Sequence, residues 1–147
     1  MIIALMANDS KKELMVQFCI AYCGELAKHR LSATASTGKL ISEATGLQIH
    51  NMLSGRLGGI QQIASQAKYN EIDVLLYFRD NKQPVSPEIL AAEDMLFRQC
   101  DLNNILYATN HAMAETLIWA LNRGELDWRE ILNPTSEYNL KKKGGLL

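Results

Sequence analysis

Short apolar runs alternate along this chain with longer segments in which apolar residues recur at helical spacing. Continuous apolar runs of this length are typical of strands that are covered on both faces of a sheet. The strongest run, Ile72–Phe78, is rich in β-branched and aromatic residues. The expected strands are Ile2–Ala7, Leu31–Ala35, Leu47–Leu53, Ile72–Phe78 and Ile105–Ala108.

Helical patterns fill the segments between these runs. Ser10 and Glu13 have the spacing of a capping box, so a helix is expected to begin there and to end near His29. Gly46 marks a helix C-terminus, and Pro87 suits the first turn of a helix. The other expected helices are Lys39–Thr45, Gln61–Lys68, Pro87 to about Asn103, a long helix through Ala114 and Leu121 that ends at Gly124, and a short one within Leu126–Leu132.

This alternation predicts the α/β class, as a three-layer fold with a five-stranded parallel sheet and helices on both faces. No linker or internal repeat interrupts the pattern, so one domain is expected over residues 1–132. Asn133 and Pro134 then break the pattern. Residues 133–147, which include Lys141 to Lys143, are expected to form a C-terminal tail that is mobile or packs on a neighbouring subunit.

Length, composition and charge exclude several classes of protein. The 147 residues fit one domain, and 48% hydrophobic residues with a net charge of −1 are ordinary for a globular protein. The charge balance provides no basic surface for nucleic acid, and no apolar run approaches the roughly 20 residues that span a bilayer. The first residues, Met1–Ala7, lack the basic start of a signal peptide. We therefore expect no nucleic-acid partner and no membrane partner.

The three cysteines form no disulfide framework and favour a reducing compartment, so a cytoplasmic location is expected. Cys19 and Cys23 share one face of the first expected helix and could form half of a metal site. No matching Cys or His pair accompanies them, so we interpret them as core residues. We expect neither a metal nor a cofactor.

A glycine-rich stretch, Ser54 to Gln62, joins the third expected strand to the next helix. Its glycines allow a sharp turn and a close approach of the backbone to a ligand. Because the first N–H groups of a helix are unpaired, such a turn can hold a phosphate. The spacing matches no standard nucleotide-binding loop, so a plain tight turn is an equal alternative.

Ligands of parallel sheets bind beyond the carboxyl ends of the strands. The residues just after the expected strands are rich in hydroxyls, amides and carboxylates, which suit a small phosphorylated metabolite or phosphate. They do not suit a dinucleotide, because no Gly-x-Gly-x-x-Gly follows any strand. These residues are Asn8, Asp9 and Lys12; Thr34, Ser36, Thr37 and Gly38; Ser54 to Gln62; Arg79 and Asp80; and Thr109, Asn110 and His111.

Taken in order, these pieces resemble the methylglyoxal synthase family from about Ile2 to Leu132. The matching motifs are Asp9 to Lys12, Ala33-Thr34 with Ser36-Thr37-Gly38, Glu43 to Leu47, Leu53-Ser54-Gly55 with Gly58-Gly59, Gln61-Gln62, Ile72-Asp73-Val74, Arg79-Asp80 and Ala108-Thr109-Asn110. The resemblance implies the methylglyoxal synthase fold. It also implies a carbon–oxygen lyase of the glycolytic bypass, which converts dihydroxyacetone phosphate to methylglyoxal and phosphate, and a cytoplasmic homo-oligomer, namely a hexamer.

The resemblance further implies roles for individual residues. It implies active-site carboxylates at Asp9 and Asp80. It implies binding of substrate or phosphate by Lys12, Thr34, Ser36, Thr37, Ser54 and Gly55.

The chain departs from the family pattern where the proton is transferred. The family's catalytic base is the aspartate of Gly-Gly-Asp-Gln-Gln, and this chain has Ile60 there. A family histidine that polarises the substrate carbonyl is replaced by Val85. Loss of a positioned base costs roughly 10²–10⁴-fold in rate, and loss of a polarising donor costs about 10²–10³-fold. A further departure puts Arg56 where the family has proline, which adds a cation for a ligand or for a neighbouring subunit.

Two main functions follow. The first is binding of phosphate or a small phosphorylated metabolite, with catalysis lost or much reduced. The alternative is an active methylglyoxal synthase with a relocated carboxylate base, such as Asp80, Asp9 or Glu88, although Asp80 and Asp9 could instead cap local N–H groups. A third possibility is a chain that assembles with a true synthase and modulates it. For His111, a surface position on the last long helix is favoured over replacement of the lost histidine.

Overall fold

The computed structural model describes residues 1–51 and 55–146. Five strands in these residues form one sheet in the order β3-β2-β1-β4-β5, and every neighbouring pair is parallel. The strands are β1 (Ile2–Ala7), β2 (Arg30–Ala33), β3 (Ile49–Asn51), β4 (Val74–Phe78) and β5 (Leu106–Ala108). The predicted five-stranded parallel sheet is confirmed.

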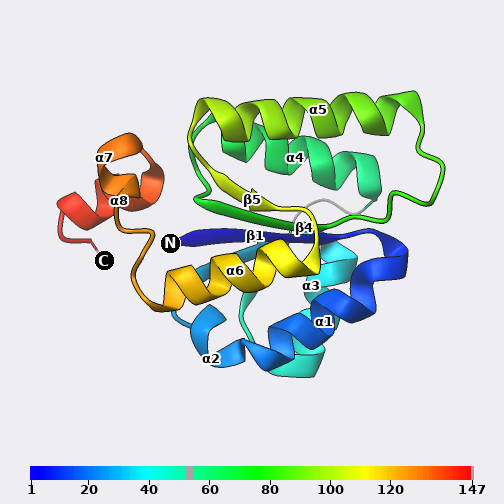
Figure 1. Ribbon diagram of the computed structural model, residues 1–147, viewed down its shortest axis with the longest axis horizontal. Coiled ribbons are helices and arrows are strands. Elements are labelled where there is room, and N and C mark those ends of the chain that lie inside the picture. The colour runs from blue at the N-terminus through cyan, green and yellow to red at the C-terminus, as the bar shows by residue number, and fades with distance from the viewer. Residues whose placement is uncertain (52–54, 147) are drawn as a thin grey trace.

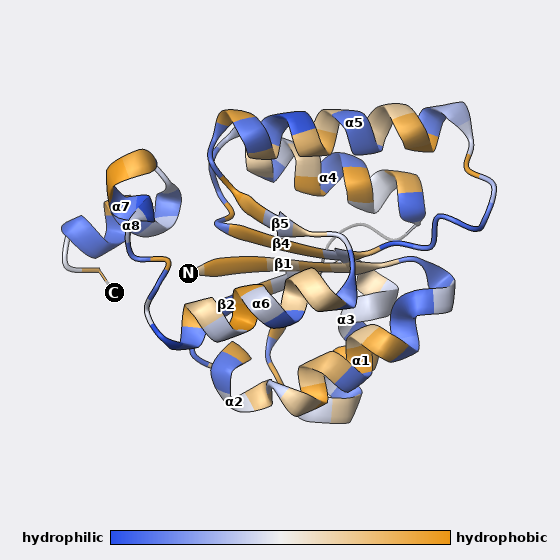
Figure 2. Cartoon of the chain, in the orientation of Figure 1, coloured by the Kyte–Doolittle hydropathy of each residue, from blue (hydrophilic) through white to orange (hydrophobic). Residues whose placement is uncertain are grey.

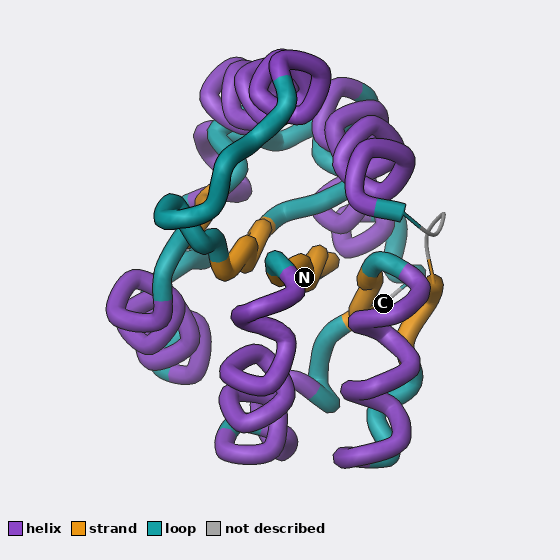
Figure 3. Tube along the Cα trace, turned by 90° about the vertical axis from the view of Figure 1, so that its right-hand side faces the viewer, coloured by secondary structure: helices purple, strands orange, loops and turns teal. Residues whose placement is uncertain are grey.

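Helices cover both faces of the sheet (Figure 1). One face carries α4 (Arg56–Lys68) and α5 (Pro87–Leu102), and the other carries α1 (Lys12–Ala21), α3 (Ala35–Thr45) and α6 (His111–Asn122). In Figure 3 the strands lie between these two layers of helices. The predicted three-layer arrangement is therefore confirmed.

Each face of the sheet has its own hydrophobic core. In β1, Ile3 and Leu5 pack toward α1, α3 and α6, while Ile2, Ala4 and Met6 pack toward α4 and α5. Successive side chains of a strand point to opposite faces, so a strand covered on both faces must be apolar at every position. This requirement explains the continuous apolar runs of β1 and β4, which are coloured orange in Figure 2.

Two helices begin earlier than their apolar patterns predict. α3 begins at Ala35 and not at Lys39, and α4 begins at Arg56 and not at Gln61. The first turns contain hydroxyl residues and glycines, which show no apolar periodicity. Within the described part of the glycine-rich stretch, Gly55 alone has a positive φ, of 88°, and the next glycines belong to the helix. The sharp turn at Gly55 is therefore the position where glycine is needed.

Ser10 does not form the predicted capping box. The chain first makes a 3-10 turn, η1 (Asp9–Lys11), and α1 begins at Lys12 without a side-chain cap. The Ser10 hydroxyl instead donates a hydrogen bond of 2.6 Å to the carboxylate of Asp80. The capping prediction is wrong because Ser10 links the end of β1 to the end of β4.

The segment after Leu132 packs on the chain itself. The α6 helix is followed by α7 (Arg129–Leu132) and α8 (Glu137–Lys143), which lie near the N-terminal end of β1 (Figure 1). Asn133 is buried, and its amide donates to Asn70 and to the carbonyl of Asn103, both at 2.7 Å. The segment is therefore held against its own chain and is not the mobile tail that the sequence predicted. The division into a domain of residues 1–132 and a tail stays a prediction.

The remaining features concern thiols, metals and membranes. Cys19 and Cys100 are buried and Cys23 is half-buried, and all three are free. Within residues 1–51 and 55–146, no cluster of three His, Cys, Asp or Glu side chains could hold a metal ion. In the same ranges, none of the helices, including the short α2 (Cys23–Leu26), has the length and apolar character needed to cross a membrane.

Candidate functional site

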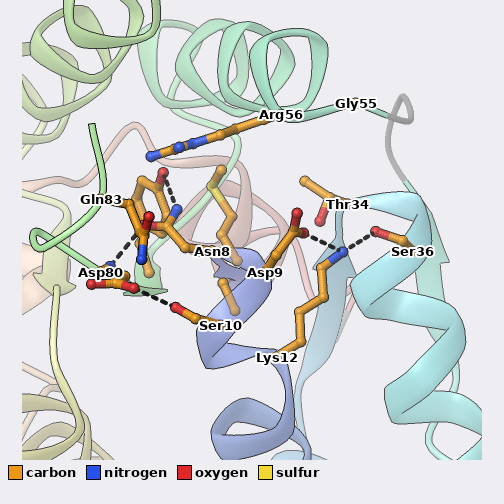
Figure 4. Close-up of a pocket in the computed structure, with 13 residues that line it drawn as sticks. Asn8, Asp9, Ser10, Lys12, Thr34, Ser36, Gly55, Arg56, Asp80 and Gln83 are labelled. Atoms are coloured by element: carbon orange, nitrogen blue, oxygen red, sulfur yellow. Dashed lines mark hydrogen bonds and ion pairs between the residues drawn. The ribbon is translucent and has the colours of Figure 1, made fainter. Parts of the chain in front are cut away.

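A cavity of about 500 Å³ opens at the carboxyl ends of β1, β2 and β4 (Figure 4). β1 and β4 are neighbours in the sheet, but they lead to helices on opposite faces, and ligands of open α/β sheets bind at such a point. The described residues that line the cavity are mostly polar. They are Met6, Ala7, Asn8, Asp9, Ser10, Lys12, Thr34, Ser36, Gly55, Arg56, Tyr77, Asp80 and Gln83.

One end of the cavity is formed by Lys12 and the start of α3. The Lys12 ammonium lies 2.9 Å from a carboxylate oxygen of Asp9 and donates a 2.9 Å hydrogen bond to the hydroxyl of Ser36. Thr34 is the N-cap residue of α3, but its side chain makes no capping bond. The first N–H groups of α3 therefore lack a side-chain acceptor, at the positive end of the helix dipole.

The start of α4 has the same property. Gly55 is its N-cap residue and has no side chain to accept from the first N–H groups. By contrast, α5, α6 and α8 are capped by the side chains of Ser86, Asn110 and Ser136. At two helices that begin at the cavity, the N-cap residue thus makes no side-chain capping bond, an arrangement suited to an anion.

A buried hydrogen-bond network forms the opposite wall. The hydroxyl of Tyr77 donates to Glu93 at 2.7 Å and accepts from the amide of Asn8 at 3.1 Å. The Asn8 side chain in turn accepts from the backbone N–H of Asp80 at 2.7 Å. Burial and the Glu93 carboxylate raise the pKa of Tyr77. Tyr77 therefore presents a neutral hydroxyl in this wall.

Two arginines share the carboxylate of Glu93, which is only 2% exposed. Arg79 donates to one oxygen at 2.6 Å, and Arg56 donates to the other at the longer distance of 3.4 Å. Of the two, Arg56 lines the cavity, and its side chain is 37% exposed. A buried carboxylate thus orients a partly exposed guanidinium at the edge of the cavity.

The two candidate catalytic carboxylates, Asp9 and Asp80, both line the cavity. The side chain of Asp9 is 97% exposed, and its hydrogen bond and ion pair with Lys12 lower its pKa. The pKa of Asp80 is also lowered, first by the Ser10 hydroxyl and then by the N–H of Lys82. A general base works best with a pKa near the working pH, which burial usually provides. Neither carboxylate has that environment.

The two replaced family positions lie apart from the cavity lining. Ile60 is fully buried in the apolar cluster beneath α4 and α5, together with Met6 and Ile63. Val85 is half-buried in the loop between β4 and α5. Among the residues that the structure describes, neither lines the cavity. A hydrocarbon side chain packed in a core can neither accept nor donate a proton.

The structure brings most of the predicted site residues together. Asp9, Lys12, Thr34, Ser36, Gly55 and Asp80 line one cavity. Thr37 is fully buried in the first turn of α3 and is not part of the described lining, and its hydroxyl has no partner in the described ranges. Ser54 lies outside the described residues. The roles of these residues stay predictions.

Sequence reasoning missed Tyr77 and Glu93. Tyr77 is one residue in an apolar strand and carries no separate signal. Glu93 lies four residues after Ile89 and three before Leu96, which puts it in the apolar stripe of α5. A carboxylate in an apolar stripe is the signal that could have revealed the network, because charged residues are rarely buried without a partner.

Known proteins match this chain over nearly all of its length. A methylglyoxal synthase of Caldicellulosiruptor saccharolyticus is 54% identical over 143 residues, which are 96% of this chain and 99% of the relative. A methylglyoxal synthase of Oceanobacillus iheyensis is 50% identical over 137 residues, which are 92% of this chain and 95% of the relative. The chain belongs to the methylglyoxal synthase family. Membership confirms the resemblance found in the motifs.

A solved structure of the methylglyoxal synthase family agrees in fold. The crystal structure of methylglyoxal synthase from Elizabethkingia anophelis NUHP1 matches with a TM-score of 0.70 and 36% sequence identity, covering 80% of this chain and 76% of that chain. No family model matches the chain. The methylglyoxal synthase-like fold is therefore confirmed, and the relatives support the family reaction as the chemistry from which this site derives.

Proposed function

We propose that this chain binds phosphate or a small phosphorylated metabolite in the cavity, and that it has lost all or most of the family's conversion of dihydroxyacetone phosphate to methylglyoxal. The observation that carries the proposal is a contrast between the cavity and the position of the family's catalytic base. Lys12 and the starts of α3 and α4 surround the cavity, whereas Ile60 lies in the apolar core.

The binding half of the proposal rests on the donors around the cavity. Lys12 supplies a cation, Thr34 and Ser36 supply hydroxyls, and Gly55 lets the backbone of α4 begin close to the cavity. Phosphate favours such a combination, because charge-assisted hydrogen bonds and helix N-termini stabilise anions. In the free protein the carboxylate of Asp9 forms an ion pair with the Lys12 ammonium. A more highly charged phosphate can compete for the same ammonium.

The catalytic half rests on the missing proton acceptor. Removing a proton next to a ketone requires a base within hydrogen-bond reach of that proton. Ile60 and Val85 offer no such group. The alternative, an active methylglyoxal synthase with Asp80 as a relocated base, is favoured by the place of Asp80 in the lining. The lowered pKa of Asp80 counts against it, and the lowered pKa and almost complete exposure of Asp9 count against that residue.

Calorimetric titration with inorganic phosphate and with dihydroxyacetone phosphate tests binding. We expect saturable binding of both ligands, weakened about tenfold or more in Lys12→Gln, because a charge-assisted hydrogen bond is lost. Lys39→Gln removes an equal charge from an exposed position on α3 outside the described cavity lining, so it should bind like the unaltered protein. Absence of heat with both ligands at millimolar concentration contradicts the proposal.

A methylglyoxal assay with dihydroxyacetone phosphate tests catalysis, with a relative from the family as positive control. We expect a rate no better than that of buffer. A measurable rate that disappears in Asp80→Asn, but persists in Asp94→Asn on the exposed face of α5, would establish the alternative function instead.

Restoring the family residues provides a companion experiment. The double variant Ile60→Asp with Val85→His returns a carboxylate and an imidazole to the positions where the family pattern has them. We expect methylglyoxal formation to rise above that of the double variant Ile60→Asn with Val85→Asn. Equal, background-level rates in two folded variants would mean that other parts of the site have also been lost.

We also propose that the protein works in the cytoplasm as a homo-oligomer, with the hexamer of the family as the expected form. The free thiols support the compartment. Exposed apolar side chains on α7 support association, because Ile131 is 82% exposed and Leu132 is 56% exposed. Light scattering should give a multiple of the 16.5 kDa chain mass. The mass of a single chain contradicts this proposal.

A further inference from the structure

We propose that the cavity takes a metabolite with two anionic groups, in which Lys12 holds a phosphate and Arg56 binds a second oxyanion, namely a carboxylate or another phosphate. This inference rests on the proposed function and names the ligand class of the same cavity.

Arg56 and Arg79 have different roles at Glu93. Arg79 is held on two sides, by the carboxylate of Glu93 at 2.6 Å and by the ring of Phe97, whose centre lies 5.3 Å from the guanidinium carbon. It does not belong to the described lining of the cavity. Arg56 lines the cavity and touches Glu93 only at 3.4 Å. Arg79 is thus the structural partner of the buried carboxylate, and Arg56 is the arginine available to a ligand.

Where Arg56 meets Glu93, the guanidinium groups outnumber the carboxylates by one. A single carboxylate, Glu93, faces two guanidinium groups, and the third contact of Glu93 is the neutral hydroxyl of Tyr77. Asp9 and Asp80 are the other carboxylates of the described lining, and Asp9 is already paired with Lys12 at 2.9 Å. Asp80 accepts from the Ser10 hydroxyl at 2.6 Å and from the N–H of Lys82 at 3.0 Å, and the cations that act on its charge are Lys11 and Lys82. An incoming oxyanion would supply the missing counter-charge of Arg56.

The two cations lie at different ends of the cavity. Figure 4 shows Lys12 beside Thr34 and Ser36 on one side, and the guanidinium of Arg56 above Asn8 and Gln83 on the other. The amides of Asn8 and Gln83 line the cavity near Arg56. A volume of about 500 Å³ accommodates a three-carbon compound with an anionic group at each end. The planar fork of arginine suits an oxyanion better than a neutral hydroxyl.

A matched pair of ligands tests this inference. Glycerol 3-phosphate and 3-phosphoglycerate differ only in that a hydroxymethyl group of the first is a carboxylate in the second. We expect the unaltered protein to bind 3-phosphoglycerate about tenfold more tightly or better. A second comparison, between the affinities for the bisphosphate and the monophosphate of propane-1,3-diol, tests whether the second oxyanion is a phosphate.

Three variants connect the preference to Arg56. Arg56→Gln removes the charge, and Arg56→Pro restores the residue of the family pattern at the first position of α4, where proline is well tolerated. Both should bring the affinity ratio of the matched ligands close to one while glycerol 3-phosphate still binds. Arg123→Gln removes an equal charge from the exposed end of α6, outside the described cavity lining, and should keep the ratio.

The outcomes separate the two proposals. If neither inorganic phosphate nor any of these ligands binds, the proposed function fails. If glycerol 3-phosphate binds but the unaltered protein prefers neither 3-phosphoglycerate nor the bisphosphate, this inference alone is overturned. It is also overturned if Arg56→Gln weakens both matched ligands equally, since Arg56 would then act only as a general positive charge. Far-UV circular dichroism verifies that each variant is folded, and the ratio in the unaltered protein needs no variant.

Discussion

Among single residues, Glu93 has the most consequential position, because it joins the wall of the cavity to the core. Its carboxylate is 2% exposed and accepts from Tyr77, Arg56 and Arg79. The apolar residues around it in α5 correctly predicted the helix, but they did not reveal the network. A periodic pattern reports which side of a helix is buried, and it cannot report that distant donors meet a carboxylate there.

Replacing Glu93 tests this network. Glu93→Gln keeps the shape but leaves two guanidinium groups without their counter-charge. Because both arginines keep partial contact with water, we expect the free energy of unfolding to fall by about 2–3 kcal/mol, less than for a fully buried pair. Denaturant titration measures the change. Glu43→Gln, in an exposed pair with Lys39 at 3.9 Å, should change stability by less than about 0.5 kcal/mol, and equal effects would contradict the prediction.

The thiols give a second prediction for single residues. Burial raises the pKa of Cys19 and of Cys100 to about 12, whereas Cys23 is half-buried. At pH 8 only about one in ten thousand of the buried thiols is ionised, and the thiolate is the reactive form. We expect a thiol reagent to modify one cysteine of the folded protein and all three after denaturation. Loss of the native reaction in Cys23→Ser would support this, and rapid reaction of two or more thiols in the folded protein would refute it.

At the scale of elements, the helix starts at the cavity were the least predictable boundaries. β1 and β4 were predicted closely because double-sided burial demands continuous apolar runs, whereas β3 begins at Ile49 and not at the predicted Leu47. The first turns of α3 and α4 carry Ser36, Thr37, Gly58 and Gly59, which resemble a loop in composition. They are helical because the chain beyond them packs on the sheet. Their N-cap residues, Thr34 and Gly55, make no side-chain capping bond at the position where the site requires donors.

The C-terminal elements depend on a buried ion pair. Arg129 of α7 and Asp73, just before β4, are each only 1% exposed, and they form a charge-assisted hydrogen bond. Asp73 also accepts from the N–H of Ile2 at 2.8 Å. One ion pair therefore connects α7 to the first strand and to the start of β4.

Breaking this pair should loosen the C-terminal segment. Arg129→Met leaves the Asp73 carboxylate buried without its cation, so we expect a loss of about 3–5 kcal/mol in the free energy of unfolding. The substitution should also increase the rate of amide hydrogen exchange more in α8 than in β1. Arg98→Gln, at an exposed position of α5, serves as the control and should cost less than about 0.5 kcal/mol. A loss of similar size in both variants would contradict the role of the pair.

For the whole molecule, ligand binding should appear as added stability. A ligand that binds only the folded state stabilises it by about 2.7 kcal/mol at one hundred times its Kd, which corresponds to a rise in Tm of roughly 5–10 °C for a chain of this size. We expect such a rise with phosphate and none with chloride at equal ionic strength. The rise should fall to about half or less in Lys12→Gln, because tenfold weaker binding lowers the stabilisation to about 1.4 kcal/mol, and it should be retained in Lys39→Gln. Equal shifts in both variants would mean that phosphate acts elsewhere on the protein.

The sequence by itself determined the sheet, its two apolar faces, the family and most of the residues that meet at the strand ends. These features depend on local periodicity and on short motifs, which are properties of neighbouring residues. The tertiary structure alone decided that Ser10 binds Asp80, that the C-terminal segment packs on its own chain, and that Tyr77, Glu93 and Arg56 form one wall. These contacts join residues far apart in the chain, and only the folded packing of β1, β4, α4 and α5 brings their polar groups within hydrogen-bond distance.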